Sequence, residues 1–186
     1  WDENAQKTYK ANFTDDFEIA GDITKIEEKE IPSFDICLAG FPCQAFSLAG
    51  QRKGFEDNYK GLCRGTLFMD VARICEHHKP KVIFCENVKG LVIHDKGRTF
   101  KVITKTFQDL GYTVYSQVLN SKNFGVPQNR ERLFVISILG EHEPYVFPST
   151  QTLNSSLNDI LEDNVDDKFY MNKPFVLLEE KDNTTS

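Results

Sequence analysis

The sequence has no run of about 20 apolar residues, the length that a helix needs to cross a membrane, so we expect no membrane partner. Its first residues are neither basic nor apolar and do not resemble a secretory signal. Internal repeats are also lacking. Because the chain begins at Trp1 rather than at methionine, we expect the natural N-terminus to lie upstream.

The five cysteines are an odd number, and no two of them form a Cys-x-x-Cys pair, which argues against a disulfide framework. Cys37, Cys75 and Cys85 lie among apolar residues and are predicted to be core residues, whereas Cys63 lies in a polar stretch that we interpret as a loop. This usage is typical of a protein in a reducing compartment, and we expect a cytoplasmic location.

The 186 residues are enough for one domain with a substantial core. The net charge of −6 is unevenly distributed. Residues 1–30 carry nine acidic and four basic side chains, and residues 141–186 carry ten and three. Residues 31–140 carry fifteen basic and nine acidic side chains instead. A surface facing nucleic-acid phosphates would therefore lie in the middle of the chain, although charge alone fits an ordinary solvated surface about equally well.

Two short apolar runs, residues 34–40 and 81–85, are typical of buried parallel strands. Apolar residues at helical spacing follow each run, over residues 67–75 and 100–110, and Gly111 is placed to end the second helix. This alternation of strands and helices predicts an α/β fold with βαβ units and a mostly parallel sheet.

The pattern then changes. Residues 113–119 and 133–138 have the composition of strands, and only about a dozen residues without a helical pattern separate them. Since a parallel connection needs a longer crossover, we predict an antiparallel pair at one edge of the sheet. From about residue 144 the chain is polar and acidic, and we expect only a short helix near residues 157–161.

Cys43 is the first candidate functional residue. Ligands of open α/β sheets bind at the carboxyl ends of strands, and Cys43 follows the first predicted strand within Gly40–Ser47. The Gly-Phe-Pro turn before it would lift the thiol clear of the sheet. A thiolate stabilised by cations or backbone amides is a good nucleophile, although an isolated cysteine is more often a buried structural residue.

Two further candidate sites lie near strand ends. Glu86 comes immediately after the second predicted strand, where a carboxyl group can be partly desolvated and hold a proton. Arg130 and Arg132 are two residues apart, share one face of a strand, and could clamp an anion or a carbonyl oxygen. Taken singly, each of these residues is also compatible with an ordinary surface charge or helix cap.

Together the three segments closely resemble the signature motifs of bacterial DNA cytosine-5 methyltransferases of restriction–modification systems, the HhaI methylase type. They also occur in the same order along the chain as in that family. The motifs are Gly40–Ser47, Glu86-Asn87-Val88 and Gln128-x-Arg130-x-Arg132. The resemblance covers nearly all of residues 1–150. It implies a Rossmann-like S-adenosylmethionine-dependent methyltransferase fold, with a mostly parallel sheet and an antiparallel edge strand.

The resemblance also implies a domain organisation. Residues 1–148 would form the catalytic domain without the family's first strand and glycine-rich loop. Residues 149–186 would begin the linker, acidic and partly disordered, towards a missing target-recognition region. The chain would then be a truncated enzyme or one part of a split enzyme, with a complementary chain supplying target recognition.

The activity implied by the resemblance is methylation of carbon 5 of a cytosine in double-stranded DNA, with S-adenosyl-L-methionine as cofactor and no metal. Cys43 would attack carbon 6 of the cytosine, which must be flipped out of the duplex to be reached. Glu86 would bond the ring N3 and the exocyclic amine, and Arg132 would hold the carbonyl oxygen with support from Arg130. Such an enzyme would protect host DNA from a cognate nuclease.

The resemblance further assigns cofactor and DNA contacts. Asp22 would bond the adenine amine, Ile23 would pack on the adenine ring and Trp1 would stack on it. The full cofactor set is Trp1, Asp22, Ile23, Pro42 and Leu67. The expected DNA contacts are Phe41, Gln44, Ser47, Arg52 and Lys53.

Three other interpretations remain open. The tRNA cytosine branch of the same fold usually has Pro-Pro-Cys-Gln-Pro-Phe where this chain has residues 41–46 as Phe-Pro-Cys-Gln-Ala-Phe. A zinc-binding interaction module would have to use Cys63, Cys75, His77 and His78, whose spacing fits no tetrahedral-site pattern. A non-catalytic fragment or subunit of a split enzyme would retain the motifs without turning over.

Overall fold

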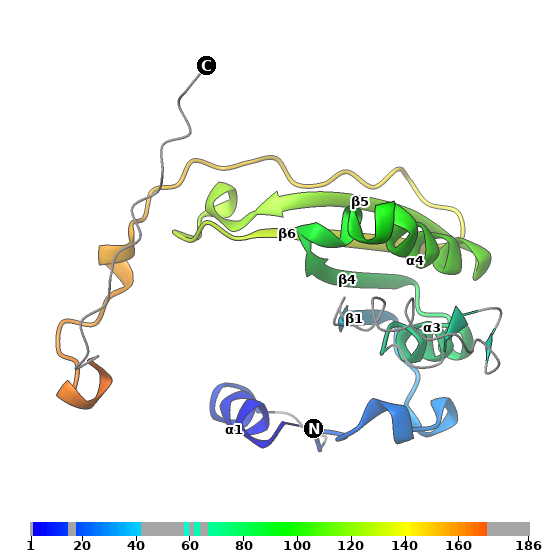
Figure 1. Ribbon diagram of the computed structural model, residues 1–186, viewed down its shortest axis with the longest axis horizontal. Helices are drawn as coiled ribbons and strands as arrows, with labels where there is room; N and C mark the ends of the chain where they lie inside the picture. Colours follow the sequence, from blue (N-terminus) through cyan, green and yellow to red (C-terminus); the bar gives the residue numbers. More distant parts are fainter. Residues whose placement is uncertain (1, 15–17, 42–57, 60–61, 64–66, 171–186) are drawn as a thin grey trace.

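A four-stranded mixed sheet, in the order β1-β4-β6-β5, forms the centre of the fold (Figure 1). The computed structural model describes residues 2–14, 18–41, 58–59, 62–63 and 67–170. The strands of the sheet are β1 (Ile36–Gly40), β4 (Val82–Val88), β5 (Tyr112–Asn120) and β6 (Glu131–Leu139). β1 and β4 are parallel, and β6 runs antiparallel to both of its neighbours. The predicted α/β class and the antiparallel pair are therefore confirmed.

Two helices cover one face of this sheet, and the core lies between them and the strands. They are α3 (Leu67–His78) and α4 (Arg98–Asp109). The rings of Phe68 from α3 and Phe107 from α4 meet with centroids 5.4 Å apart. From the sheet, alternate residues of β4 and β6 point into the same core: Ile83, Cys85, Leu133 and Val135. α4 ends as predicted just before Gly111, whose φ of +95° is a conformation that favours glycine.

The cysteines predicted to be core residues divide into two groups. Cys75 and Cys85 are 0% and 1% exposed and belong to the core cluster. Cys37 is partly buried and packs against that cluster.

The second predicted strand is longer than expected. β4 continues through Glu86 to Val88, because β6 pairs with it along its whole length and the last pair joins Val88 to Arg132. The expectation that Glu86 follows the strand was therefore wrong, since Glu86 lies inside it. The apolar run ends earlier than the strand because Glu86 and Asn87 are polar although both pair with β6.

The β5–β6 pair lies at one edge of the sheet, as predicted. Within the pair, β5 takes the outer position, and β6, which was expected to be the edge strand, lies between β5 and β4. α4 carries the chain from β4 to a β5 strand that is not adjacent to it. β6 then runs antiparallel between β4 and β5 and forms hydrogen bonds with both strands.

The segments outside the sheet are short. α1 (Glu3–Asn12) and two 3₁₀ turns, η1 (Ile23–Lys25) and η2 (Glu28–Glu30), precede β1. β2 (Asn58–Tyr59) and β3 (Leu62–Cys63) form a two-stranded antiparallel ribbon, so the backbone of Cys63 lies in a strand rather than in the predicted loop. Further 3₁₀ turns are η3 (Lys89–Val92), η4 (His94–Gly97), η5 (Ser121–Phe124), η6 (Leu157–Ile160) and η7 (Asp167–Phe169).

Beyond β6 the chain first runs along the sheet and then extends away from it (Figure 1). The expected short helix near residues 157–161 is present as the single turn η6. Apolar side chains of this extension are exposed, including Leu157 at 59% and Phe169 at 71%. In the part of the chain that the structure describes, no helix is long and apolar enough to span a membrane.

Candidate active site

The carboxyl ends of β1 and β4 lie side by side, as their parallel pairing requires. Gly40, the last residue of β1, pairs with Glu86. One residue further, the side-chain amide of Asn87 donates a hydrogen bond to the Phe41 carbonyl over 2.6 Å, while its own oxygen accepts from the Val88 amide over 2.9 Å. Asn87 is 6% exposed. Asn87 was noticed only as part of a motif, and its contact with the start of the Cys43 segment is visible only in the structure.

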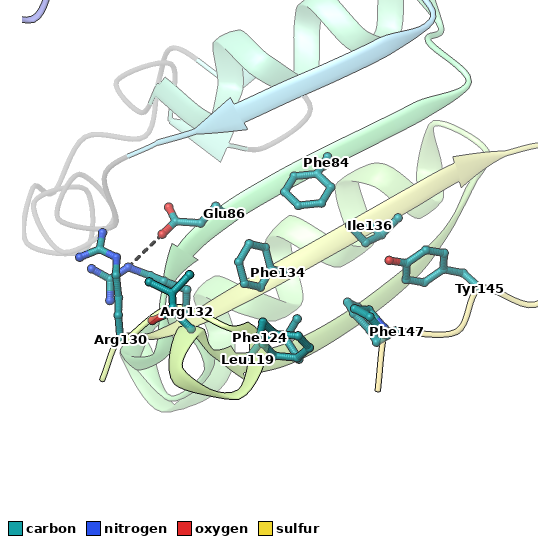
Figure 2. Close-up of a pocket in the computed structure, with 13 residues that line it drawn as sticks. Phe84, Glu86, Leu119, Phe124, Arg130, Arg132, Phe134, Ile136, Tyr145 and Phe147 are labelled. Atoms are coloured by element: carbon teal, nitrogen blue, oxygen red, sulfur yellow. Dashed lines mark ion pairs between the residues drawn. The ribbon is translucent and has the colours of Figure 1, made fainter. Parts of the chain in front are cut away.

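Glu86 and Arg132 form the charged centre of the site. Arg132 Nε lies 2.9 Å from Glu86 Oε1, with side chains 24% and 39% exposed, respectively. Figure 2 shows this pair at one end of a pocket, with the Arg130 side chain beside it. The Glu86 carboxyl group is therefore paired with a guanidinium in this structure.

The backbone around Arg130 is held by the end of β5. Asn120 accepts a hydrogen bond from the Arg130 backbone amide over 3.1 Å and donates to the Asn129 side chain over 2.7 Å. Ser121 donates from its hydroxyl to the Gln128 carbonyl over 2.6 Å. These contacts cross-link the connection between β5 and β6. Neither Asn120 nor Ser121 was singled out from the sequence, because a polar residue at a strand end has no distinctive spacing.

Arg130 and Arg132 line the same pocket, as expected for residues two positions apart. The pocket has a volume of about 420 Å³, within the usual range for small-molecule sites. One end is charged, formed by Glu86, Arg130 and Arg132. The rest is mainly apolar. Figure 2 shows Phe84, Leu119, Phe134 and Ile136 on the strands, Phe124 at the end of η5, and Tyr145 and Phe147 on the segment that follows β6.

This pocket offers a flat apolar floor with a carboxylate and a guanidinium at its rim. A carboxylate accepts hydrogen bonds, and a guanidinium donates them in a fixed fork. A planar ring that carries an amine and a carbonyl group on one edge could donate to the carboxylate and accept from the guanidinium.

The proposed adenine segment lies before β1. Asp22 caps η1, and its Oδ1 accepts from the Thr24 hydroxyl over 2.7 Å and from the Thr24 amide over 3.1 Å. These bonds hold the pKa of Asp22 below its usual value, so the group is an ionised acceptor at neutral pH. Both Thr24 bonds use the same oxygen, and the other lies 3.6 Å from Lys25 Nζ. With Ile23 partly buried next to it, the turn has the acceptor and the apolar surface that an adenine amine and ring require.

The remaining sequence-predicted positions divide into two groups. Leu67 is the first residue of α3 and is 38% exposed. The other positions lie outside the described residues: Trp1, Pro42, Cys43, Gln44, Ser47, Arg52 and Lys53.

Phe41 differs from the expectation of a DNA contact. Its ring is 7% exposed and packs on Phe68, with centroids 5.2 Å apart, and its carbonyl is bonded by Asn87. Burial of the ring leaves little of the side chain for a ligand. Phe41 is therefore a core residue that anchors the start of the following segment.

Metal ligands are not grouped in the described part of the chain, where no three His, Cys, Asp or Glu side chains are arranged to hold an ion. Cys75, one of the four residues that a zinc module would use, is 0% exposed in the core.

Comparison with known proteins places the chain in a family. The sequence profile described as "C-5 cytosine-specific DNA methylase" matches residues 1–186. The chain belongs to this family. It is 50% identical over 173 residues to the type II methyltransferase M.SsoII of Shigella sonnei, a match covering 91% of this chain and 44% of that protein.

Two other relatives are similarly close. The chain is 46% identical over 163 residues to M.HhaI of Haemophilus parahaemolyticus, covering 87% of this chain and 48% of that protein. It is 50% identical over 186 residues to M.HpaII of Haemophilus parainfluenzae, covering 95% and 49%. The chain thus spans about half the length of these relatives.

Solved structures confirm the methyltransferase fold. A DNMT2 variant from Spodoptera frugiperda superposes with a TM-score of 0.68 at 22% identity, covering 90% of this chain and 52% of that one. The Dnmt2 methyltransferase of S. pombe gives a TM-score of 0.64 at 18% identity, covering 91% and 52%.

Proposed function

We propose that this chain is the catalytic part of an enzyme that transfers a methyl group from S-adenosylmethionine to carbon 5 of a flipped cytosine in DNA. The observation that carries the proposal is the Glu86–Arg132 ion pair, at 2.9 Å, beside the carboxyl end of β1. Phe41 follows β1 directly, and Cys43 is two residues further on. Two peptide units span no more than about 7 Å, and this short separation along the chain from Phe41 supports the assignment of Cys43 to the same site.

Cys43 is the proposed nucleophile. Carbon 5 of cytosine is a poor nucleophile because the ring is aromatic and electron-poor. The Cys43 thiolate forms a bond to carbon 6, and the electron pair of the 5,6 double bond moves into the ring, which leaves carbon 5 able to take a methyl group. Water then takes the proton from carbon 5, and the electron pair of that C–H bond re-forms the 5,6 double bond as the C–S pair returns to the Cys43 thiolate.

Glu86 and Arg132 are the proposed groups that hold the base. Glu86 bonds the ring N3 and the exocyclic amine, and the guanidinium of Arg132 donates to the carbonyl oxygen, where negative charge grows as the adduct forms. Arg130, on the same side of the pocket, supports this end. In this scheme, contacts to the base replace part of the ion pair between Glu86 and Arg132.

The cofactor supplies the methyl group. Asp22 and Ile23 are proposed to hold its adenine, and Leu67, at the start of α3, to lie against it. Trp1 and Pro42 are proposed contacts on the same ligand.

Double-stranded DNA is the proposed substrate. The basic excess of residues 31–140 would attract its phosphates, and Gln44, Ser47, Arg52 and Lys53 are proposed contacts. We propose that residues 1–148 form the catalytic domain and that residues 149–186 lead to a region that recognises the target. Protection of host DNA in the cytoplasm is the role that fits such an enzyme.

To test the proposal, the protein encoded by the complete open reading frame is incubated with methyl-labelled S-adenosylmethionine and either DNA or tRNA. The products are then digested to nucleosides. Label in 5-methyldeoxycytidine is the expected result. Label only in 5-methylcytidine from tRNA would favour the tRNA branch of the same fold. Cofactor binding without transfer to either substrate would favour a non-catalytic subunit.

A further inference from the structure

Arg73 makes three contacts from the middle of α3, one from each guanidinium nitrogen. Its Nη2 donates to the Ile23 carbonyl over 2.7 Å. Its Nη1 lies 3.0 Å from Glu28 Oε1, and its Nε lies 2.9 Å from Asp70 Oδ1. The Arg73 side chain is 22% exposed. The arginine therefore connects the helix to both 3₁₀ turns, η1 and η2.

The segment that Arg73 contacts lies outside the hydrophobic core. None of residues 18–31 is buried, so apolar contacts alone do not fix its position. A second polar contact from the same helix joins His78 Nε2 to the Glu28 carbonyl at 2.7 Å. Three contacts from α3, one at η1 and two at η2, therefore join this segment to the helix.

Asp70 completes the arrangement. Its side chain is 13% exposed, and it lies one turn before Arg73 on the same helix. A carboxylate in this place holds the guanidinium plane and directs the remaining nitrogens towards Ile23 and Glu28. The planar fork of arginine suits this task, whereas the single ammonium of lysine cannot make all three contacts.

α3 also carries Leu67, six residues before Arg73. Six residues of α-helix rise about 9 Å, so the helix sets a fixed separation between Leu67 and the turn of Asp22 and Ile23. A ligand that contacts both must match that separation.

We propose that Arg73 is a positioning residue for cofactor binding, which sets the Asp22–Ile23 turn against α3 before the ligand arrives. The inference rests on the proposed function, in which that turn holds the adenine of S-adenosylmethionine. Arg73 itself touches the Ile23 carbonyl and not the ligand. Because Arg73 holds the turn in place before the ligand binds, binding does not have to supply the free energy needed to order the turn.

The test uses three variants of the complete open reading frame. Arg73→Ala removes the contacts, and Arg73→Lys keeps the charge. Arg98→Ala is the matched control, because Arg98 also pairs with an aspartate three residues earlier, Asp95, over 2.7 Å, but does so on an exposed surface. Calorimetry measures the affinity for S-adenosylmethionine and for adenosine, and steady-state kinetics separate KM for the cofactor from kcat.

Arg73→Ala is expected to weaken binding of both ligands by a similar factor of about 10- to 100-fold, the range for losing one hydrogen bond to a charged group. Arg73→Lys should fall between it and the wild type, and Arg98→Ala should bind normally. KM for the cofactor should rise while kcat at saturating cofactor changes little. Backbone amides of residues 23–26 should exchange faster with deuterium in Arg73→Ala alone.

Three outcomes would overturn the inference. Normal cofactor affinity in Arg73→Ala would show that the clamp does not position the turn. Equal weakening in Arg73→Ala and Arg98→Ala would show a general loss of charge or stability. Absence of adenosine and S-adenosylmethionine binding in the wild type would instead refute the proposed function, and the inference with it.

Discussion

The side-chain amide of Asn87 donates to the backbone carbonyl of Phe41 over 2.6 Å, joining the end of β4 to the residue that follows β1. Both residues are buried, at 6% and 7% exposed. A buried hydrogen bond of this kind fixes the point from which the segment carrying Cys43 departs.

Asn87→Ala is expected to leave the Phe41 carbonyl without this donor and to lower the free energy of unfolding by about 1–3 kcal/mol. Under the proposed mechanism, turnover should fall further than stability alone explains, because Phe41 anchors the chain two residues before the proposed nucleophile, Cys43. Asn12→Ala is the control, since Asn12 donates to the Thr8 carbonyl over 2.8 Å on an exposed helix. Denaturant unfolding and the rate of methyl transfer at saturating substrates measure the two effects. Equal turnover in the two variants would contradict this role for Asn87.

Glu86→Gln keeps the size of the side chain and removes its charge. We expect the rate to fall by about 10²–10⁴-fold, the range that positioned acid–base groups supply, with little change in melting temperature. Glu131→Gln is a matched control, because Glu131 pairs with Lys89 at the same distance of 2.9 Å on an exposed surface. A Glu86→Gln enzyme with near-normal turnover and a much lower melting temperature would make Glu86 a structural residue.

Arg132 is expected to matter more than Arg130. Arg132 is in contact with Glu86 and 24% exposed at the side chain, whereas Arg130 precedes β6 and is exposed. Arg132→Lys loses the fork that can bond the carboxylate and the base carbonyl together, and kcat should fall at least about tenfold, the effect of losing one charged hydrogen bond. Arg130→Lys should change it less. The reverse order, measured as kcat at saturating DNA and cofactor, would reassign the two residues.

The buried cysteines are expected to be inert in the native protein. Burial raises the pKa of the Cys85 thiol to about 12. Pairing with Cys37 and burial also raise the pKa of the Cys75 thiol. Because a raised pKa keeps a thiol protonated, neither should react with iodoacetamide at pH 8, and both should react once the protein is denatured. Mass spectrometry of alkylated peptides measures this, and fast native labelling of Cys85 would contradict its place in the core.

Strands and helices were predictable where periodicity was strong. The spacing of Phe100, Ile103 and Phe107 gave α4, and Gly111 marked its end, because one face of that helix packs on the sheet. The sequence failed where a strand lost its apolar composition. Glu86 lies inside β4, but a charged residue after an apolar run is also how a strand normally ends. The inner position of β6 depends on which strands pair, and strand pairing is set by contacts distant along the chain.

The candidate site was predictable only where residue type implies chemistry. Cysteine, glutamate and arginine in fixed order pointed to a nucleophile, a carboxyl group able to hold a proton, and a clamp for an anion or a carbonyl oxygen. Asn120 and Ser121 carry no such signal, since only the fold brings them to Gln128 and Arg130. Arg73 is similar, because its partner Ile23 lies fifty residues away along the chain. Phe41 belongs to the most specific motif, yet its ring faces the core.

The most direct test of the central claim is covalent trapping of the enzyme on DNA that contains 5-fluorocytosine. Fluorine cannot leave carbon 5 as a proton does, so the adduct made by the attacking thiolate cannot be released. With S-adenosylmethionine present, the protein encoded by the complete open reading frame should form a DNA–protein conjugate that survives denaturation. Peptide mapping should place the bond on Cys43. Cys43→Ser should form none. A conjugate mapped to Cys63, or undiminished trapping by Cys43→Ser, would contradict the account.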